Sequence, residues 1–447
     1  MIIKNRNELE TTELRRKALD IAKAAVERVL PSNVMRVSVA YYPVLKIFRI
    51  TNDSYDLSKG RLFVVGGGKA SGLMAETLEA VMGAENITDG IVNCKSGGYK
   101  TEKIKVVEAG HPIPDERGRQ GVTEMLELKQ KYHIGENDFV LCLISGGGSA
   151  LLPCPIPGIS LGDEQKITSL LLECGAEIGE INAIRKHISR VKGGRLGEYF
   201  APAKVISLIL SDVVGNNLDV IASGSTCPDS STYEDAYNVL EKYTLLTKAP
   251  ENIVSYLEMG MRGEAEETPK ELTNSENYII GDNRLALDAA ADKAREMKFR
   301  PFIITSQQKG DTGVTASERA REISSGKYRG YNVILIGGET TCKLPEGHGQ
   351  GGRNQHYAAA SMTMMDKYPG EWVLVSLGTD GSDFLPDVAG AVVDNNSLKT
   401  ARSKGIDVNS YLKRYDSYHF LDNLGNSLIR TGNTGTNVGD VIIYLLG

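Results

Sequence analysis

The stretch RLFVVGGGKASGLMAETLEAVM, residues 61–82, decides the fold class. Residues 61–65 predict a buried strand, because a short apolar run that ends in glycine is typical of one. The glycine turn at residues 66–72 follows, and a helix is expected from there to about Met82. A strand, a glycine-rich turn and a helix in this order are typical of an α/β protein that binds a ligand at the turn.

The same alternation of strand and helix continues along the chain. Further strands are expected at residues 90–93, 104–108, 138–144, 204–210, 301–305, 332–336, 372–377 and 439–446. Helices are expected at residues 12–30, 115–132, 167–173, 180–191, 282–297 and 314–324, and another from about residue 350. Pro31 should end the first helix, and Asp115 should cap the second. Alternating strands and helices predict largely parallel sheets with helices on both faces.

Length and composition set the domain organisation. The 447 residues allow two or three domains at about 150 residues each, and two large α/β domains also fit. Hydrophobic residues make up 41% and charged residues 24%, which excludes a disordered chain and a coiled coil. The clearest change of composition lies at residues 261–277, which are charged and lack an apolar period. We therefore expect a larger Rossmann-like domain with a doubly wound parallel sheet at residues 1–265, and a smaller α/β domain with a mixed sheet at residues 266–447.

Charge and cysteine content exclude several classes of function. The formal net charge is -6 and there is no basic block, so neither a nucleic acid nor a membrane is expected as a partner. No apolar run approaches about 18 residues, and the first ten residues lack the apolar core of a secretory signal. The six cysteines form no CxxC pair, which favours buried free thiols over a zinc site. These features predict a cytoplasmic protein.

The turn at residues 66–72 has the composition of a phosphate site. Lys69 follows three glycines, and backbone amides in such turns attract anions. Ala70 after Lys69 excludes a Walker A loop, and the expected second strand ends at Asn93 rather than at an acidic residue, which argues against a dinucleotide fingerprint. A tight turn with a solvated lysine is the structural alternative.

Two further segments of the first domain are candidates for anion binding. Residues 145–150, SGGGSA, place three glycines between two serines after a buried strand, which predicts a deep anion nest. Residues 182–197 are basic and could form a cationic wall for phosphates or a carboxylate, or a solvated helix face. Their basic side chains are Arg185, Lys186, His187, Arg190, Lys192 and Arg195.

The remaining candidate site residues lie at other expected strand ends and at one expected helix start. Asp212 follows the strand at 204–210, where it suits a general base, a magnesium ligand or a turn cap. Arg353 follows two glycines at a helix start, where it could stabilise a transferring phosphoryl group. The segments at 337–340 and 379–381, GGET and TDG, are polar loops of the second domain.

These loops, in this order, resemble the glycerate 2-kinase family, also called the MOFRL family. The resemblance covers about residues 12–447, and ten short motifs carry it. They are VGGGKAS (65–71), GHPIPD (110–115), ISGGGSA (144–150), EINAIRKH (180–187), KGGRL (192–196), LSDV (210–213), GGET (337–340), GQGGRNQ (349–355), GTDG (378–381) and GNTGTNV (432–438).

The resemblance implies transfer of the γ-phosphoryl group of ATP to the 2-hydroxyl of D-glycerate, with Mg²⁺, to give 2-phosphoglycerate and ADP. It implies two α/β domains with the active site in the cleft between them. It also implies that Lys69, Asp212 and Arg353 are the catalytic residues.

Binding roles are expected for further residues, on the chemistry of their loops together with the resemblance. Phosphate or substrate binding is expected of Gly67, Gly68, Ser145, Gly146, Gly147, Gly148, Ser149, Arg185 and Lys192. Nucleotide binding is expected of Gly337, Glu339, Thr340, Thr379 and Asp380. Asp212 and Asp380 are the expected ligands of Mg²⁺ or another divalent cation.

Two alternatives stay open in the sequence. One is an NADH-dependent hydroxypyruvate reductase, a name that this family has also carried. The other is a non-catalytic protein that binds sugar phosphates or nucleotides, for which Asp212 and Arg353 would be unnecessary. The oligomeric state is not set by the sequence, and a homodimer is compatible with it.

Overall fold

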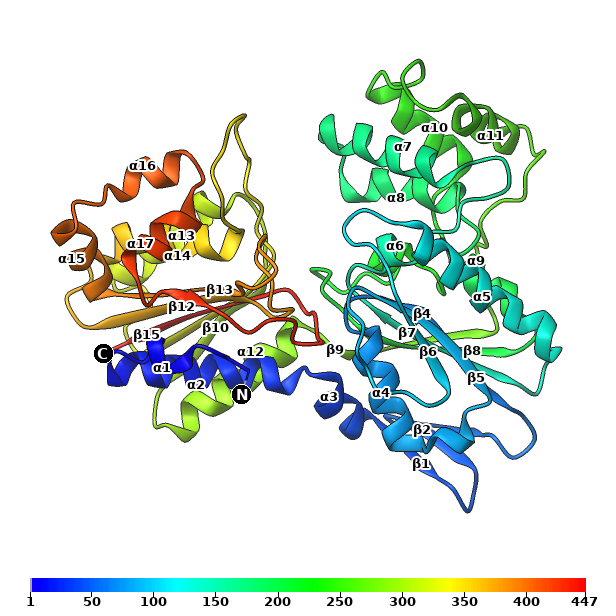
Figure 1. Ribbon diagram of the computed structural model, residues 1–447, viewed down its shortest axis with the longest axis horizontal. Helices are drawn as coiled ribbons and strands as arrows, with labels where there is room; N and C mark the ends of the chain where they lie inside the picture. Colours follow the sequence, from blue (N-terminus) through cyan, green and yellow to red (C-terminus); the bar gives the residue numbers. More distant parts are fainter. Residues whose placement is uncertain (1) are drawn as a thin grey trace. The chain divides into compact units, whose positions relative to one another are not determined.

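The computed structural model describes residues 2–447, which form two compact α/β units (Figure 1). One unit, here the parallel-sheet unit, comprises residues 34–211 and 216–280. The other, the mixed-sheet unit, comprises residues 2–33, 212–215 and 281–447. The predicted fold class, α/β with one parallel and one mixed sheet, is confirmed.

Six strands form the sheet of the parallel-sheet unit, in the order β6-β5-β4-β7-β8-β9. The pairs that join β6 through β8 are all parallel, as the sequence predicted. The strands are β4 (Leu62–Gly67), β5 (Asp89–Cys94), β6 (Ile104–Glu108), β7 (Phe139–Ser145), β8 (Lys204–Leu210) and β9 (Ser275–Gly281).

Helices cover both faces of this sheet. Consecutive residues of a strand point to opposite faces, and on β5 the Asn93 side chain donates to Gly118 O of α5 (Glu116–Tyr132). The next residue, Cys94, donates to Lys69 O, at the start of α4 (Ser71–Met82). α4 and α5 therefore lie on opposite faces, and Asp115 caps α5 as predicted.

Further helices of this unit form their own apolar cluster. Its core comes from α7, α8, α10 and α11. The helices and 3₁₀ turns that follow α5 are α6 (Gly148–Leu151), α7 (Leu161–Glu173), α8 (Ile178–His187), α9 (Arg195–Phe200), η2 (Ile221–Ser223), α10 (Tyr233–Lys242) and α11 (Glu251–Met261), and η1 (Ala84–Asn86) follows α4.

A small antiparallel sheet near the start of the chain was not predicted. Its strands, in the order β1-β2-β3, are β1 (Val39–Tyr42), β2 (Ile47–Ile50) and β3 (Asp53–Asp56). They are short, and much of their surface is exposed, so they lack the apolar run on which the other strands were predicted. Pro31 begins α3 (Pro31–Ser38) as well as following the first long helix, since proline suits the first position of a helix.

The mixed-sheet unit is built on six strands in the order β10-β11-β15-β12-β13-β14. Only the pair β10 and β11 is parallel, and the other pairs are antiparallel. The strands are β10 (Pro301–Gln308), β11 (Val333–Gly338), β12 (Trp372–Gly378), β13 (Gly390–Asp394), β14 (Leu428–Ile429) and β15 (Asp440–Leu446).

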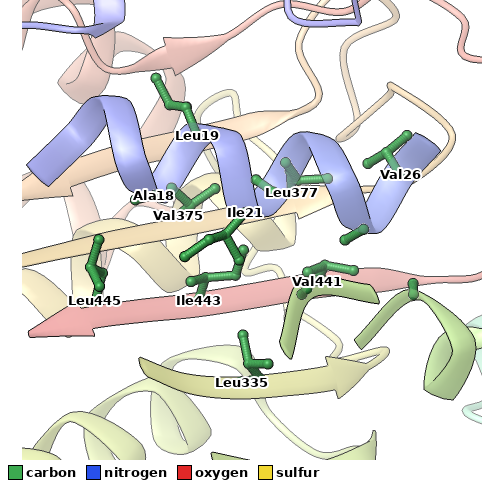
Figure 2. Close-up of a cluster of buried hydrophobic side chains, with 14 of the residues drawn as sticks. Ala18, Leu19, Ile21, Val26, Leu335, Val375, Leu377, Val441, Ile443 and Leu445 are labelled. Atoms are coloured by element: carbon green, nitrogen blue, oxygen red, sulfur yellow. The ribbon is translucent and has the colours of Figure 1, made fainter. Parts of the chain in front are cut away.

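Alternate residues of β15 build the two apolar cores of this unit. Val441, Ile443 and Leu445 pack against α2 (Glu13–Arg28) and α12 (Asn283–Glu296). Figure 2 shows this face, with Ala18 and Ile21 of α2 over β12 and β15. The other residues of β15 point to the opposite face of the sheet and pack in the cluster of α13 (Thr312–Ser324) and α14 (Arg353–Met365). The remaining helices are α1 (Arg6–Leu9), α15 (Asn395–Ser403), α16 (Val408–Lys413) and α17 (Ser417–Leu424).

The structure divides the chain differently from the expected boundary between residues 265 and 266. The charged segment at 261–277 leads into β9, and Val205 N on β8 donates to Asn274 O at 2.8 Å. At the other end of the chain, α2 packs into the mixed-sheet unit because its apolar stripe completes one face of that sheet. Arg15 of α2 fixes this placement, since its Nε donates to Asp394 Oδ2 at 2.7 Å.

No helix within residues 2–447 has the length and apolar character that a membrane span requires.

Replacing Arg15 by alanine should destabilise the mixed-sheet unit by about 3 kcal/mol, because Asp394 would stay buried without its ion partner. Trp372 is the single tryptophan of the chain and is buried in β12, so its fluorescence follows this unit during urea unfolding. Arg16→Ala is the matched control, since Arg16 pairs with the exposed Glu13 on the same helix and should leave the midpoint nearly unchanged. Equal shifts in both variants would contradict the placement of α2 against this sheet.

Candidate active site

The two glycine loops of the parallel-sheet unit lie side by side, because β4 and β7 are neighbouring parallel strands. Lys69 N donates to Gly146 O at 2.9 Å, and Ala70 N donates to Ser145 Oγ at 2.9 Å. Ser145 is fully buried. Its hydroxyl oxygen therefore ties the first glycine loop to the second, and the backbone of Lys69 is fixed by both loops.

Glycine is required where these loops touch. Gly68 has φ +155°, and a Cβ there would lie 2.2 Å from Ser145 Oγ. At Gly147, with φ +80°, a Cβ would lie 2.8 Å from His111 Nε2 and 3.3 Å from Lys69 Cγ. Lys69 and His111 therefore flank the same glycine. His111 lies in the GHPIPD motif, but its type and position alone predicted no role for it.

Ser149 connects the second glycine loop to α8. Its Oγ lies 2.8 Å from Ser223 Oγ, and Ser223 Oγ lies 3.1 Å from Asn182 Oδ1. Ser223 is held with φ +56°, in the left-handed region that non-glycine residues seldom adopt. Asn182 is 2% exposed, and its Nδ2 has no hydrogen-bond partner within residues 2–447. Sequence reasoning missed both residues, since neither is charged.

The basic segment on and after α8 is mostly internal. Lys186 is 2% exposed and pairs with Asp219 and, at 3.0 Å, with Asp229. Lys192 is fully buried, donates to Leu152 O at 2.8 Å and lies 3.3 Å from a carboxylate oxygen of Glu164. Both lysines are thus held by carboxylates of the same unit, and this segment is not a solvated basic face.

Arg185 differs from these lysines. Within the described chain its guanidinium makes a single hydrogen bond, a long one of 3.4 Å from Nε to Thr168 Oγ1. Burial lowers the pKa of Arg185, and the charge of Glu164 opposes that effect. A partly buried guanidinium with few partners is suited to an anionic ligand.

In the mixed-sheet unit, the start of β15 organises the predicted residues. Asp440 is its first residue and pairs with Gly338 at the end of β11 and with Gly378 at the end of β12. β15 runs antiparallel to both strands, so its start meets their ends. The loops at 337–340 and 378–381 therefore leave the sheet on either side of Asp440.

Arg353, the first residue of α14, is held by this strand start. Its Nε and Nη2 donate to the two carboxylate oxygens of Asp440 at 2.6 and 3.0 Å, and its Nη1 lies 2.8 Å from Glu339 Oε1. Burial alone would lower the pKa of Arg353, but the charges of Asp440 and Glu339 raise it well above its usual value. The side chain remains 33% exposed, so a phosphate oxygen could still reach this fixed positive charge.

Asp212 also belongs to the mixed-sheet unit, although it follows β8 in the chain. Asn437 Nδ2 donates to Asp212 Oδ2 at 2.7 Å, and Asn437 is 5% exposed. Asn437 lies three residues before Asp440. The structure therefore brings two of the predicted catalytic residues, Asp212 and Arg353, to the same strand start.

The loop that carries Thr379 and Asp380 packs on the GNTGTNV segment at residues 432–438. Thr379 Oγ1 donates to Gly439 O at 2.7 Å and accepts from Val438 N at 2.9 Å. Asp380 Oδ1 accepts from Ser382 N at 2.9 Å. A Cβ at Gly378 would lie 3.4 Å from Asp380 Oδ1 and 3.5 Å from an oxygen of the Asp440 carboxylate, so both carboxylates lie near this glycine.

Polar side chains from α12 and α13 lie against the GGET loop. Gly337 allows Asn283 to approach, since a Cβ there would lie 1.8 Å from Asn283 Oδ1. Asn283 Nδ2 donates to Val438 O and to Asp440 O, at 3.0 and 2.8 Å. Thr340 is buried, and Thr312 Oγ1 donates to its Oγ1 at 3.0 Å.

His356 lies one turn after Arg353 on α14 and is 5% exposed. Its ring stacks on Tyr415, with centroids 4.6 Å apart. Burial lowers the pKa of His356 to about 4, so the ring is neutral at pH 7. This histidine therefore supplies no charge for phosphate binding.

Within residues 2–447, no group of three or more His, Cys, Asp or Glu side chains is arranged to hold a metal ion.

A motif of hydrolases, Gly-x-Ser-x-Gly, occurs at residues 158–162 as GISLG. Its serine, Ser160, is the N-cap of α7 and forms a capping box with Asp163. Ser160 Oγ donates to Asp163 Oδ2 at 2.7 Å. The motif is a helix cap here rather than a nucleophile elbow, which requires a strand directly before the serine.

Comparisons with known proteins agree with the resemblance seen in the sequence. The model of a domain of unknown function (DUF4147) matches residues 17–258, and the model of the MOFRL family matches residues 332–440. The chain is 39% identical over 443 residues to the glycerate 2-kinase of Pyrococcus horikoshii, covering 96% of this chain and 98% of that protein. It is 39% identical over 440 residues to the D-glycerate 2-kinase of Thermotoga maritima, covering 97% and 98%.

The fold is shared with a solved structure. The crystal structure of glycerate kinase from Thermotoga maritima superposes with a TM-score of 0.82 at 38% identity, covering 97% of this chain and 99% of that one. A putative hydroxypyruvate reductase of Agrobacterium vitis is 35% identical over 395 residues, covering 87% of this chain and 100% of that protein. Two family models in order, near-complete coverage and the shared fold show that the chain belongs to the MOFRL family of glycerate kinases.

Proposed function

We propose that this chain transfers the γ-phosphoryl group of ATP to the 2-hydroxyl of D-glycerate, giving 2-phosphoglycerate and ADP. The observation that carries the proposal is the Arg353 guanidinium, fixed by Asp440 and Glu339, while Asn437, three residues before Asp440, holds Asp212. Such a charge is what phosphoryl transfer needs, because that reaction is catalysed by positioning and by electrostatic stabilisation. The names of the two 39% identical relatives support the same acceptor and hydroxyl.

Three residues carry the chemical step in this proposal. The 2-hydroxyl oxygen of glycerate attacks the γ-phosphorus, and the bond from that phosphorus to the bridging oxygen of ADP breaks. Asp212 orients the hydroxyl and accepts its proton late in a loose transition state. Arg353 and Lys69 stabilise the negative charge on the transferring group.

The glycine loops and α8 supply the acceptor side. Backbone amides of Gly67, Gly68 and the segment 145–149 would bind a phosphate or the glycerate carboxylate, as amides in such turns do. Arg185, with its single long hydrogen bond, is the better cation for the carboxylate. Lys192 is already held by Glu164 and Leu152 O, and its contribution would be to keep the second loop in place.

The loops around Asp440 supply the nucleotide side. Gly337, Glu339, Thr340, Thr379 and Asp380 are the proposed contacts of ATP. They leave the sheet from the two strands that flank Asp440.

Mg²⁺ fits this nucleotide site as a companion of ATP rather than as a resident ion. Magnesium is commonly held by one or two carboxylates together with phosphate oxygens. Carboxylates outnumber cations around Arg353, since Glu339, Asp383 and Asp440 surround one guanidinium. Asp380 and Asp212 would hold the ion, which would supply charge neutralisation at the phosphates.

The proposed setting is the cytoplasm, with ATP and D-glycerate as the small-molecule partners. The net charge of -6 offers no attraction for nucleic acid or for an anionic membrane. A homodimer remains a prediction from the sequence.

The reductase alternative has a specific difficulty. In dinucleotide-binding folds an acidic residue at the end of the second strand binds the ribose. Here the corresponding strand β5 has the buried Asn93, whose Nδ2 donates to the main-chain oxygens of Gly118 and Leu151. This side chain holds the fold and is not available to a ribose.

The product of the reaction tests the proposal. With D-glycerate, ATP and Mg²⁺, the purified chain should give a signal in an assay coupled through enolase alone, because enolase acts on 2-phosphoglycerate directly. A signal only when phosphoglycerate mutase is added would mean attack by the 3-hydroxyl. No signal in either assay, with NADH consumed on hydroxypyruvate, would overturn the kinase in favour of the reductase.

The role of Asp212 predicts a graded loss of activity. Asp212→Asn should lower kcat about 100-fold or more, the scale of losing a general base. Asn437→Ala should lower kcat about 10-fold, because Asp212 keeps its carboxylate but loses a hydrogen bond that orients it. Asn423→Ala is the control, an exposed asparagine of the same unit. A kcat of Asp212→Asn within about 5-fold of wild type would remove Asp212 from the mechanism.

A further inference from the structure

The helix that begins with Arg353 lacks a cap of its own. Its N-cap position is Gly352, which has no side chain to accept from the first amides of α14. Those amides are strong donors that need partners when buried. A carboxylate from another segment, that of Asp383, takes this role. It lies in the loop after β12.

Asp383 accepts from both of the residues that follow Arg353. Asn354 N donates to Asp383 Oδ1 at 3.0 Å, and Gln355 N donates to Oδ2 at 2.9 Å. The side-chain Nε2 of Gln355 donates to the same Oδ2 at 3.0 Å and to the main-chain oxygen of Asp383 at 2.9 Å. Gly352 makes the approach possible, since a Cβ there would lie 2.2 Å from Asp383 Cγ.

Asn354 links this cap to the carboxylate that holds Arg353. Its Nδ2 lies 3.3 Å from Asp383 Oδ1 and donates to Asp440 Oδ1 at 2.9 Å. The same Asp440 oxygen accepts from Arg353 Nη2 at 3.0 Å. Ser376 Oγ donates to Asn354 Oδ1 at 2.7 Å, so the amide cannot rotate freely. Asp383, Asn354, Asp440 and Arg353 therefore form one continuous hydrogen-bonded chain.

The burial of Asp383 makes the charged form of its carboxylate energetically costly. Asp383 is 3% exposed, and burial raises its pKa to about 6, although the Asn354 amide and the charge of Arg353 oppose that rise. The carboxylate is thus ionised at pH 7 in a site that disfavours its charge. A buried ionised group of this kind persists only where hydrogen bonds satisfy it, and the four N–H donors of Asn354 and Gln355 do so.

We propose that Asp383 is a positioning residue for phosphoryl transfer, because it caps α14 in place of Gly352 and, through Asn354 and Asp440, fixes the Arg353 guanidinium. The proposal rests on the proposed kinase function. Asp383 does not touch the substrates. It acts by holding Arg353 where the transferring group will carry its charge, and a misplacement of about 1 Å in such a group lowers a rate about 100-fold.

Asp383→Asn is the decisive variant. It keeps the side-chain volume, but it replaces one carboxylate oxygen, which accepts from the Gln355 amides, by an NH2 group, which can only donate. We expect kcat to fall at least about 30-fold, with the KM values for ATP and D-glycerate within about 3-fold of wild type. The matched control is Asp394→Asn. Asp394 is 2% exposed and caps α15 in the same unit, at the other end of β12, where it pairs with Val373. That variant should keep kcat within about 2-fold.

A double variant separates positioning from general loss of structure. If Asp383 acts through Arg353, Asp383→Asn should lower kcat by less than about 3-fold in an Arg353→Ala background. Losses that multiply instead would overturn the proposal. So would a folded Asp383→Asn chain, shown by wild-type Trp372 fluorescence, whose kcat is within about 3-fold of wild type.

Asn354→Ala decides the matter if Asp383→Asn does not fold. It removes the link to Asp440 and leaves the cap on the main-chain amides intact. The expected result is a kcat at least about 10-fold lower at unchanged KM, and a kcat within 2-fold would overturn the proposal. Wild type is assayed beside every variant. A wild type that makes no phosphoglycerate refutes the proposed function itself, whereas an active wild type matched by its variants refutes only the positioning role.

Discussion

The ion pair between Asp440 and Arg353 is the interaction on which the rest of the candidate site depends. Asp440 begins the central strand of a mixed sheet, between the ends of two neighbouring strands. The loops at 337–340 and 378–381 therefore leave their strands next to this residue. A bidentate contact to it fixes the direction of the Arg353 guanidinium as well as its charge. The sheet therefore determines where a phosphoryl group could be stabilised.

A comparison with Arg15, a buried arginine of the same unit, shows why the exposure of Arg353 matters. Arg15 also contacts an aspartate, Asp394, but its side chain is only 5% exposed. Its remaining nitrogens donate to Asn426 O and Ser397 Oγ, so each of them has a partner within the fold. Arg353 is 33% exposed at a similar ion pair. The first pair can only hold α2 in place, whereas the second can also meet a ligand.

The sequence was sufficient to predict most strands of the two six-stranded sheets, the long helices that pack on them and the loops that carry the candidate residues, but not β9, β13, β14 or the small sheet β1-β2-β3. Buried strands that end in glycine are distinctive, and the helix cap Asp115 is visible in the sequence. The order of strands was not visible. Nothing in the apolar run at residues 440–446 shows that it inserts between β11 and β12, so the partner of Arg353, 87 positions away, could not be predicted.

The sequence also did not predict which elements and side chains pack against one another. The periodicity of α2 predicts a helix but does not say which sheet it covers, and α2 covers the sheet formed by the other end of the chain. Lys186 and Lys192 looked like surface cations because their carboxylate partners lie far along the chain. Asp383 shows no signal beyond its position near Asp380, because the lack of a cap at Gly352 matters only once α14 and β12 are neighbours.

Affinity for a transition-state analogue tests the central claim most directly. Aluminium fluoride with ADP, Mg²⁺ and D-glycerate mimics the transferring phosphoryl group, and its binding can be measured by titration calorimetry beside that of ATP. The account predicts that Arg353→Ala and Lys69→Ala each weaken the analogue about 100-fold or more and change ATP affinity by less than about 5-fold, because both charges act mainly in the transition state. Equal losses for the analogue and ATP, or none for the analogue, would contradict it.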